Sequence, residues 1–123
     1  MNPIIITPAQ QTETNSFEWG ELTWFASHAL GNQAELTVGR CRLKAGHENP
    51  RHSHPNCSEV LVLAQGTIEH TAADGKTVIM HPGDVASIPA NVVHHARNVG
   101  VEEAIIWISF SSAKRETVMQ QAD

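Results

Sequence analysis

The stretch Gly46–Gly66, GHENPRHSHPNCSEVLVLAQG, carries three of the eight histidines of the chain within eight residues, and a glutamate follows five residues after the last of them. Histidine is a scarce residue that titrates near neutral pH, so a cluster of three needs a chemical reason. In an extended strand, side chains two residues apart point to the same face, which places His52 and His54 together. A turn at Pro55-Asn56 would then bring Glu59 back beside them.

Two imidazoles and a carboxylate are suitable ligands for a divalent metal ion. Burying these groups without partners in a small core is expensive, and a metal ion makes the burial favourable. A further ligand should come from His94 or His95. Adjacent residues of a strand face opposite ways, so only one of the two points inward, and the spacing alone does not choose between them. We interpret the remaining histidines as ordinary polar residues: His28, His47, His70 and His81.

The rest of the chain also has the pattern of short strands. Apolar and β-branched runs occupy residues 22–25, 34–43, 59–64, 66–72, 76–80, 84–89, 92–99 and 102–110. Turn-forming residues separate these runs, and Asp74-Gly75 predicts a hairpin. Frequent short strands of this kind are typical of an all-β sandwich or barrel. The best helical candidate is the short polar tail at residues 112–123.

Length and composition limit the class of protein. A chain of 123 residues with 41% hydrophobic residues suits one globular domain, and no apolar run approaches the ~20 residues of a spanning helix. The net charge of -5 argues against nucleic-acid and membrane partners. The N-terminus does not have the pattern of a secretory signal, so we expect a cytoplasmic protein in which Cys41 and Cys57 are reduced thiols.

At these positions the sequence resembles the cupin superfamily. The first cupin signature is a glycine, an H-x-H pair, a glutamate and a glycine at set spacings, which Gly46, His52, His54, Glu59 and Gly66 meet. The second signature is met by Gly83, Pro89, His94 and Asn98, with Asn91 in place of the usual glycine. Asparagine is also tolerant of left-handed backbone, so we expect the turn at Asn91 to persist.

The resemblance implies an all-β fold, the double-stranded β-helix or jelly-roll barrel, with a short polar C-terminal tail. It also implies that His94, and not His95, completes a metal shell with His52, His54 and Glu59. Such a shell leaves positions open for water, O2 or substrate. The cofactor would be one divalent ion, and Fe, Mn, Ni, Co and Zn all suit these ligands.

The strand pattern also predicts which residues line the pocket around this metal shell. If Glu59 points inward, Leu61 should do so too, and Cys57 could lie near the substrate. Either Ile88 and Trp107 or the alternate set Ile106, Ile108 and Phe110 should close the pocket. Arg40 and Arg42 share one strand face and could clamp a substrate carboxylate, or could both face solvent. The candidate substrate residues are therefore Arg40, Arg42, Cys57, Leu61 and Trp107.

Three functions fit these residues. The first is a metal-dependent enzyme of the isomerase or lyase type that acts on a small polar carboxylate or sugar acid. The second is an Fe(II)-dependent dioxygenase. The third is a module that binds a sugar or another effector without catalysis, because a fold does not fix a function.

We expect a homodimer, because sheet edges need cover. The expected organisation is an N-terminal arm over residues 1–15, exchanged as a strand between subunits, a barrel over residues 16–112 and a tail over residues 113–123.

Overall fold

The computed structural model describes residues 3–120 of the chain. Its largest sheet has six strands in the spatial order β1-β2-β3-β10-β5-β8, and every neighbouring pair is antiparallel. The strand bounds are β1 Glu13–Phe17, β2 Gly20–Ala26, β3 Thr37–Leu43, β5 Glu59–Gln65, β8 Val85–Ile88 and β10 Ala104–Phe110. The alternation of buried and exposed residues along β3 and β10 shows that one face of this sheet covers the interior.

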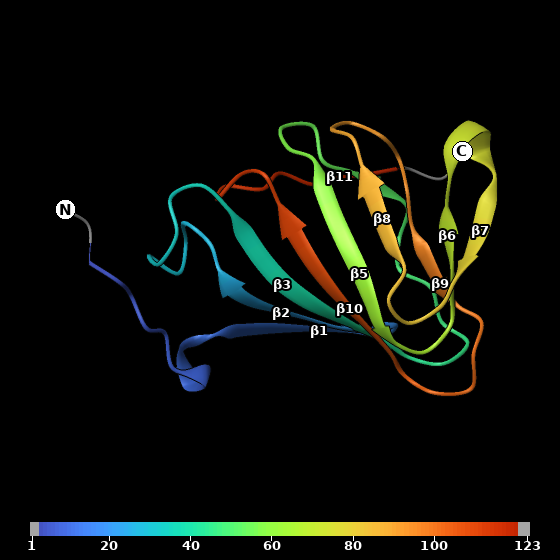
Figure 1. The fold of residues 1–123 in the computed structure, drawn as a ribbon, viewed down its shortest axis with the longest axis horizontal. Helices are drawn as coiled ribbons and strands as arrows, with labels where there is room; N and C mark the ends of the chain where they lie inside the picture. Colours follow the sequence, from blue (N-terminus) through green and yellow to red (C-terminus); the bar gives the residue numbers. More distant parts are fainter. Residues whose placement is uncertain (1–2, 121–123) are drawn as a thin grey trace.

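Two smaller sheets complete the barrel. One has the order β7-β6-β9, and the other pairs β11 with β4. Their bounds are β4 His52–Ser53, β6 Ile68–Thr71, β7 Thr77–Met80, β9 Ala96–Asn98 and β11 Val118–Met119, and short 3-10 turns lie at Ala9–Gln11 and Ala73–Gly75. In Figure 1 the long strands cross the centre of the molecule, and β6, β7 and β9 lie at one side. The predicted all-β barrel is confirmed.

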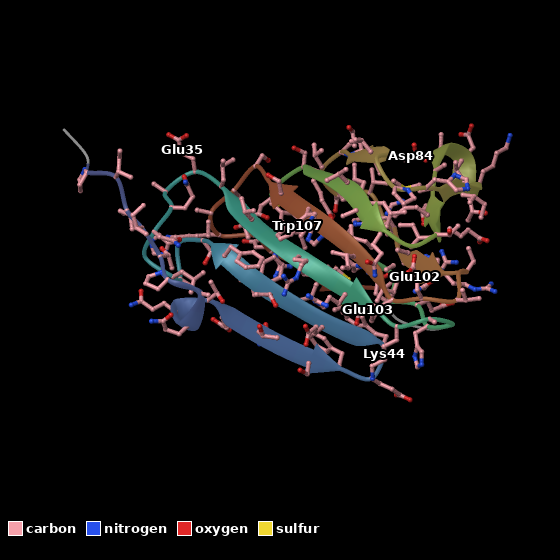
Figure 2. The ribbon with its side chains drawn as sticks, turned by 60° about the horizontal axis from the view of Figure 1, so that its bottom comes forward. Glu35, Lys44, Asp84, Glu102, Glu103 and Trp107 are labelled. Carbon is pink, nitrogen blue, oxygen red and sulfur yellow. The ribbon has the colours of Figure 1, made fainter. Side chains whose placement is uncertain are left out.

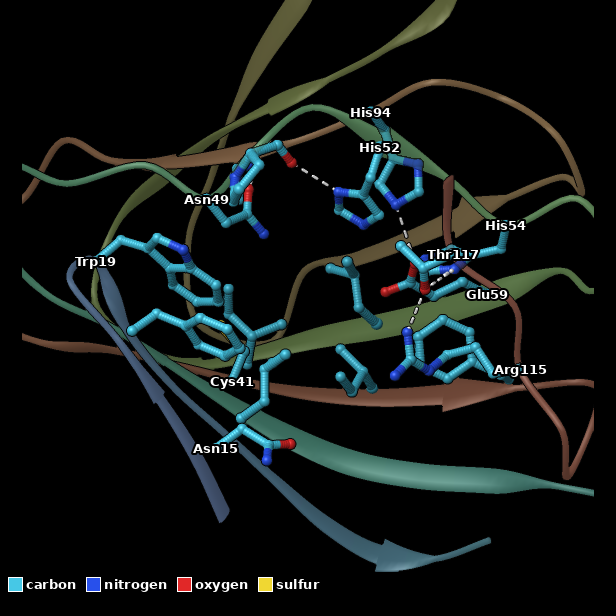
Figure 3. Close-up of a pocket in the computed structure, with 18 of the residues that line it drawn as sticks. Asn15, Trp19, Cys41, Asn49, His52, His54, Glu59, His94, Arg115 and Thr117 are labelled. Carbon is cyan, nitrogen blue, oxygen red and sulfur yellow. Dashed lines mark hydrogen bonds and ion pairs between the residues drawn. The ribbon is translucent and has the colours of Figure 1, made fainter. Parts of the chain in front are cut away.

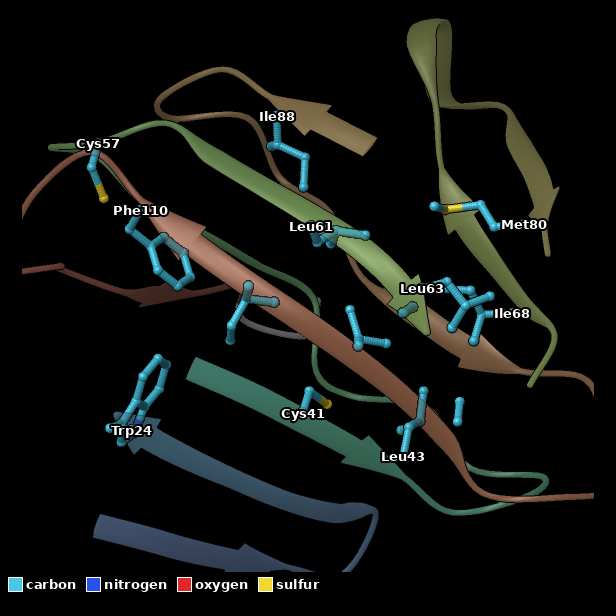
Figure 4. Packing of buried hydrophobic residues seen from close by; sticks show 14 residues of the cluster. Trp24, Cys41, Leu43, Cys57, Leu61, Leu63, Ile68, Met80, Ile88 and Phe110 are labelled. Carbon is cyan, nitrogen blue, oxygen red and sulfur yellow. The ribbon is translucent and has the colours of Figure 1, made fainter. Parts of the chain in front are cut away.

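The core lies between the sheets, where side chains from different strands meet (Figure 4). Leu43 of β3, Leu63 of β5 and Ile68 of β6 have no solvent exposure. Asn98 is buried beside them, and its amide group donates hydrogen bonds to the carbonyl oxygens of Leu43 and Glu102. This buried polar group therefore has its partners within the protein and ties β9 to the end of β3.

Among the local structures predicted from the sequence are one hairpin, one strand and one helix, of which only the hairpin forms as expected. The hairpin at Asp74-Gly75 is present between β6 and β7, with left-handed φ angles of 60° and 72°. The run expected as a strand over 92–99 is regular only at Ala96–Asn98. The helix expected at residues 112–123 does not form over 112–120, where the chain instead reaches β11; residues 121–123 lie outside the described part.

The N-terminal region also differs from the expected boundaries. Part of the expected arm belongs to the barrel of its own chain, because β1 starts at Glu13 and pairs with β2. The preceding residues 3–8 form neither a strand nor a turn of helix. None of the helical turns in residues 3–120 has the length and apolar character that a membrane crossing requires.

Asn91 occupies the turn that leads into the second histidine-bearing segment. Its φ angle is 67°, in the left-handed region, and its N–H donates to the carbonyl oxygen of His54 at 2.8 Å. Three residues later, His94 exchanges two backbone hydrogen bonds with His52. The left-handed turn therefore aligns the two histidine segments, as expected for an asparagine that replaces glycine.

We predict that Asn91→Ala lowers the free energy of unfolding by about 1 kcal/mol, because an L side chain without a local polar group resists this backbone conformation. Asn91→Gly should match or exceed the wild type. Urea unfolding followed by tryptophan fluorescence measures both variants. Equal stability of the alanine and glycine variants would show that the turn is not strained.

Candidate metal centre

A cavity of about 240 Å³ opens between the large sheet and the smaller sheets. His52, His54, Glu59 and His94 lie in its wall (Figure 3). Most of the remaining wall is apolar, with Trp19 and Leu22 among the residues near the strands of the large sheet. A small molecule that enters this cavity therefore meets a polar cluster within an apolar chamber.

Four side chains converge in this cluster from three segments of the chain. His52 starts β4, His54 follows it, Glu59 starts β5, and His94 lies just before β9. One ligand atom from each of the four lies within 4.8 Å of the others. The backbone bridge between His52 and His94 brings their rings to a centroid distance of 4.4 Å. The turn before β5 returns Glu59 to the histidines, as the sequence indicated.

Backbone carbonyl groups orient all three imidazoles. The Nδ1 atoms of His52, His54 and His94 lie 2.7, 2.9 and 2.8 Å from the carbonyl oxygens of Pro50, Glu116 and Val92, respectively. A carbonyl oxygen only accepts hydrogen bonds, so each Nδ1 carries a proton and donates. In the neutral ring the proton is then absent from Nε2, which presents a lone pair.

These lone pairs face a carboxylate. Glu59 Oε1 lies 3.0 Å from His94 Nε2 and 3.3 Å from His54 Nε2. The contact with His94 is a hydrogen bond only when that ring holds protons on both nitrogens. His54 Nε2 is buried and has no hydrogen-bond partner among residues 3–120. Converging acceptors with an orphaned buried nitrogen fit a bound divalent cation, which all of them can coordinate.

The electrostatics of the cluster leave His52 uncharged and Glu59 ionised at neutral pH. Burial lowers the pKa of His52 to about 4, so this ring is uncharged. Burial raises the pKa of Glu59, but its close contacts with the imidazoles of His54 and His94 outweigh burial and hold this pKa at about 2. Burial lowers the pKa of His94, but the hydrogen bonds to Glu59 and to the carbonyl oxygen of Val92, with the charge of Glu59, together outweigh burial, and the net shift is upward. A cation would replace the proton that Glu59 attracts to His94.

The arginines expected as carboxylate clamps lie outside the cavity. Cys41 faces inward from β3 and lines the cavity, so its neighbours Arg40 and Arg42 point to the outer face of the sheet. Arg42 pairs with Glu103 at 2.9 Å. Arg40 lies over the rings of Phe25 and Trp107. The alternative that both arginines face outward therefore matches the structure.

Of the three other candidate substrate residues, one lines the cavity and two do not. Leu61 lines the cavity, together with the alternate set Ile106, Ile108 and Phe110. Trp107 alternates with that set, is 40% exposed and lies on the outer face of the large sheet (Figure 2). Cys57 is buried in the hydrophobic core near Phe110 and does not line the cavity (Figure 4). Ile88 is likewise a core residue.

His70 and Arg115 are among the cavity residues that were not predicted from the sequence. His70, expected at the surface, is only 3% exposed, and its ring stacks against His94 at a centroid distance of 5.8 Å. Its partner in the alternation of β6 is the buried Ile68, a pattern that could have revealed an inward face. Arg115 lines the cavity from the segment expected to be a polar helix, and no sequence signal placed it there.

Comparisons with known proteins agree with this architecture. A family model described as a cupin domain matches residues 39–110. The auxin-binding protein ABP19b of Prunus persica is 35% identical over 104 residues, which cover 80% of this chain and 50% of that protein. A germin-like protein of Arabidopsis thaliana, subfamily 1 member 16, is 36% identical over 72 residues, covering 53% of this chain and 32% of that protein. The chain spans half or less of the length of these relatives.

Solved structures show the same fold. An oxalate decarboxylase of Lactobacillus farciminis, in complex with formate, superposes with a TM-score of 0.80 at 20% identity, over 89% of this chain and 34% of that one. An oxalate decarboxylase of Bacillus subtilis gives a TM-score of 0.80 at 23% identity, over 89% of this chain and 30% of that one. At these identities the likeness concerns the fold alone.

The two buried thiols give a test of the packing around the cavity. Burial, with smaller effects of Glu59 and Glu103, raises the pKa of Cys41 to about 12, and burial also raises the pKa of Cys57. We predict that both thiols of the native protein react with an aromatic disulfide reagent at pH 8 at least about tenfold more slowly than in the unfolded chain. Denatured protein is the control and should release two equivalents of chromophore. A rapidly reacting native thiol would contradict the packing.

Proposed function

This chain belongs to the cupin domain family, and we propose that it is a metal-dependent enzyme of the isomerase or lyase type that acts on a small carboxylate. The observation that carries the proposal is the set of three imidazoles whose Nδ1 protons are held by carbonyl groups, so that their Nε2 atoms converge with Glu59 in an accessible cavity. A purely structural metal site would be closed by protein ligands, whereas this cluster lines a cavity with room for a substrate.

The chain contributes three things to such a reaction. His52, His54, Glu59 and His94 would hold a divalent ion, which supplies a Lewis acid for a substrate carbonyl group. The apolar wall excludes water and strengthens electrostatic interactions in the cavity. His70 donates its Nδ1 proton to the carbonyl oxygen of Thr71, so its Nε2 is available as a proton acceptor beside the cluster.

We predict about one equivalent of a divalent metal in protein purified without a tag and without added metal. The double variant His52→Ala/His94→Ala should lose this metal, because two of the four ligand atoms disappear. His47→Ala is the matched control, since His47 is exposed and lies outside the cluster. Elemental analysis of the three proteins gives the result, and equal metal in wild type and double variant would remove the cluster from the proposal.

The metal-loaded protein should then turn over a small carboxylate in the absence of O2. We expect His54→Ala to lower kcat by at least about a hundredfold while the circular dichroism spectrum stays unchanged. A rate that requires O2 would replace this function by that of a dioxygenase. Metal binding without turnover of sugar acids or aliphatic and aromatic carboxylates would leave a binding module.

We also infer that the protein forms a homodimer through its N-terminal arm. Ile4, Ile5 and Ile6 are 89%, 55% and 82% exposed in the single chain, and such an apolar run is unfavourable in water. Because β1 starts at Glu13 within its own barrel, the residues free to exchange precede it. Deletion of residues 1–10 should convert a dimer into a monomer in light-scattering measurements. A dimer that survives the deletion would exclude the arm.

A further inference from the structure

Arg115 lies in the cavity wall on an aromatic platform. Its guanidinium carbon is 4.3 Å from the ring centroid of Trp24 and 5.2 Å from that of Phe110. The segment that carries it is fixed at both sides by Asn56, whose side chain donates to the carbonyl oxygen of Lys114 and accepts from the N–H of Glu116. The guanidinium group is therefore held in place before any ligand arrives, and Figure 3 shows it on the same side of the cavity as Glu59.

The positive charge of Arg115 has no carboxylate partner in the described chain. No ion pair joins it to an acidic side chain of residues 3–120, and its side-chain hydrogen bond goes to the neutral hydroxyl of Thr117. The nearby negative charge of Glu59 is directed at His54 and His94. A half-buried guanidinium group has five N–H donors, so most of its hydrogen-bonding capacity remains for a ligand.

The side chains around Arg115 indicate which chemical groups the rest of the ligand should carry. Leu22, Ile106 and Ile108 belong to the apolar part of the cavity wall, and Asn15 and Asn49 add amide groups to it. Apolar residues predominate in this wall, so the several hydroxyl groups of a sugar acid would find fewer partners there than in water. A ligand with an apolar body has no such hydrogen bonds to lose, and burial of its apolar surface is favourable.

We propose that Arg115 is a specificity-determining residue that binds the carboxylate of a small monocarboxylate with an apolar body. A planar guanidinium group matches a carboxylate through two parallel hydrogen bonds. The body of the ligand packs against the apolar wall, and its carboxylate end lies on the side of the cavity that also holds Glu59 of the histidine cluster. This inference rests on the proposed function only in that the bound ligand would react at the histidine cluster. Binding at Arg115 is measurable without catalysis.

The test uses cyclohexanecarboxylate and its neutral isostere cyclohexanecarboxamide, with gluconate as a sugar acid. Binding is followed by intrinsic tryptophan fluorescence, to which Trp19 and Trp24 of the cavity wall contribute, in protein as purified and after chelator treatment. We expect the wild type to prefer cyclohexanecarboxylate over both other compounds by at least about tenfold in both states. Arg115→Gln should abolish the preference over the amide, and Arg115→Lys should retain part of it.

Arg97→Gln is the matched control, because Arg97 is exposed on β9 and does not line the cavity. It should bind all three compounds as the wild type does, and unchanged metal content and thermal unfolding of Arg115→Gln would show that the fold persists. Equal affinity for carboxylate and amide in the wild type, or an unchanged preference in Arg115→Gln, would overturn the inference. Loss of turnover with this preference intact would overturn only the proposed enzyme function.

Discussion

The organising constraint of this protein is the convergence of hydrogen-bond acceptors in a place that water reaches poorly. Three imidazole nitrogens and a carboxylate oxygen meet within 4.8 Å, and the protons that could relieve their repulsion are held on the far side of the rings by backbone carbonyl groups. Such an arrangement is costly without a cation and favourable with one. The backbone bridge between His52 and His94 and the turn before Glu59 hold these four groups together.

The two faces of the large sheet carry chemically different side chains. On β3, inward Cys41 alternates with outward Arg40 and Arg42, and on β10 the inward Ile106 and Ile108 alternate with the outward Trp107. On the outer face Arg42 pairs with Glu103 and Arg40 lies over aromatic rings, whereas the cavity receives its positive charge from a different part of the chain. A pocket that is apolar on its strand side and charged on its loop side can distinguish the two ends of a small molecule.

Local spacing explains why the fold and the cluster could be predicted and why the cavity could not. The strands, the hairpin at Asp74-Gly75 and the grouping of His52, His54 and Glu59 depend on periodicity and turn residues, which a sequence displays. The choice between the two faces of β3 depends on register across the barrel, so the spacing of Arg40 and Arg42 left it open. The position of Arg115 depends on contacts with Asn56, far away in sequence, and its polar neighbourhood gave the false appearance of a helix.

The three carbonyl groups that orient the histidines differ in origin. His52 and His94 each use the carbonyl group two residues earlier, so their orientation depends only on their own short segments of chain. His54 uses Glu116, which lies beyond the last long strand of the barrel, β10. During synthesis on the ribosome, a chain that has emerged only as far as β10 therefore has strands β1 to β10 and all four ligand residues but not the group that turns His54 toward them. A segment translated after β10 thus orients the ring of a residue made much earlier.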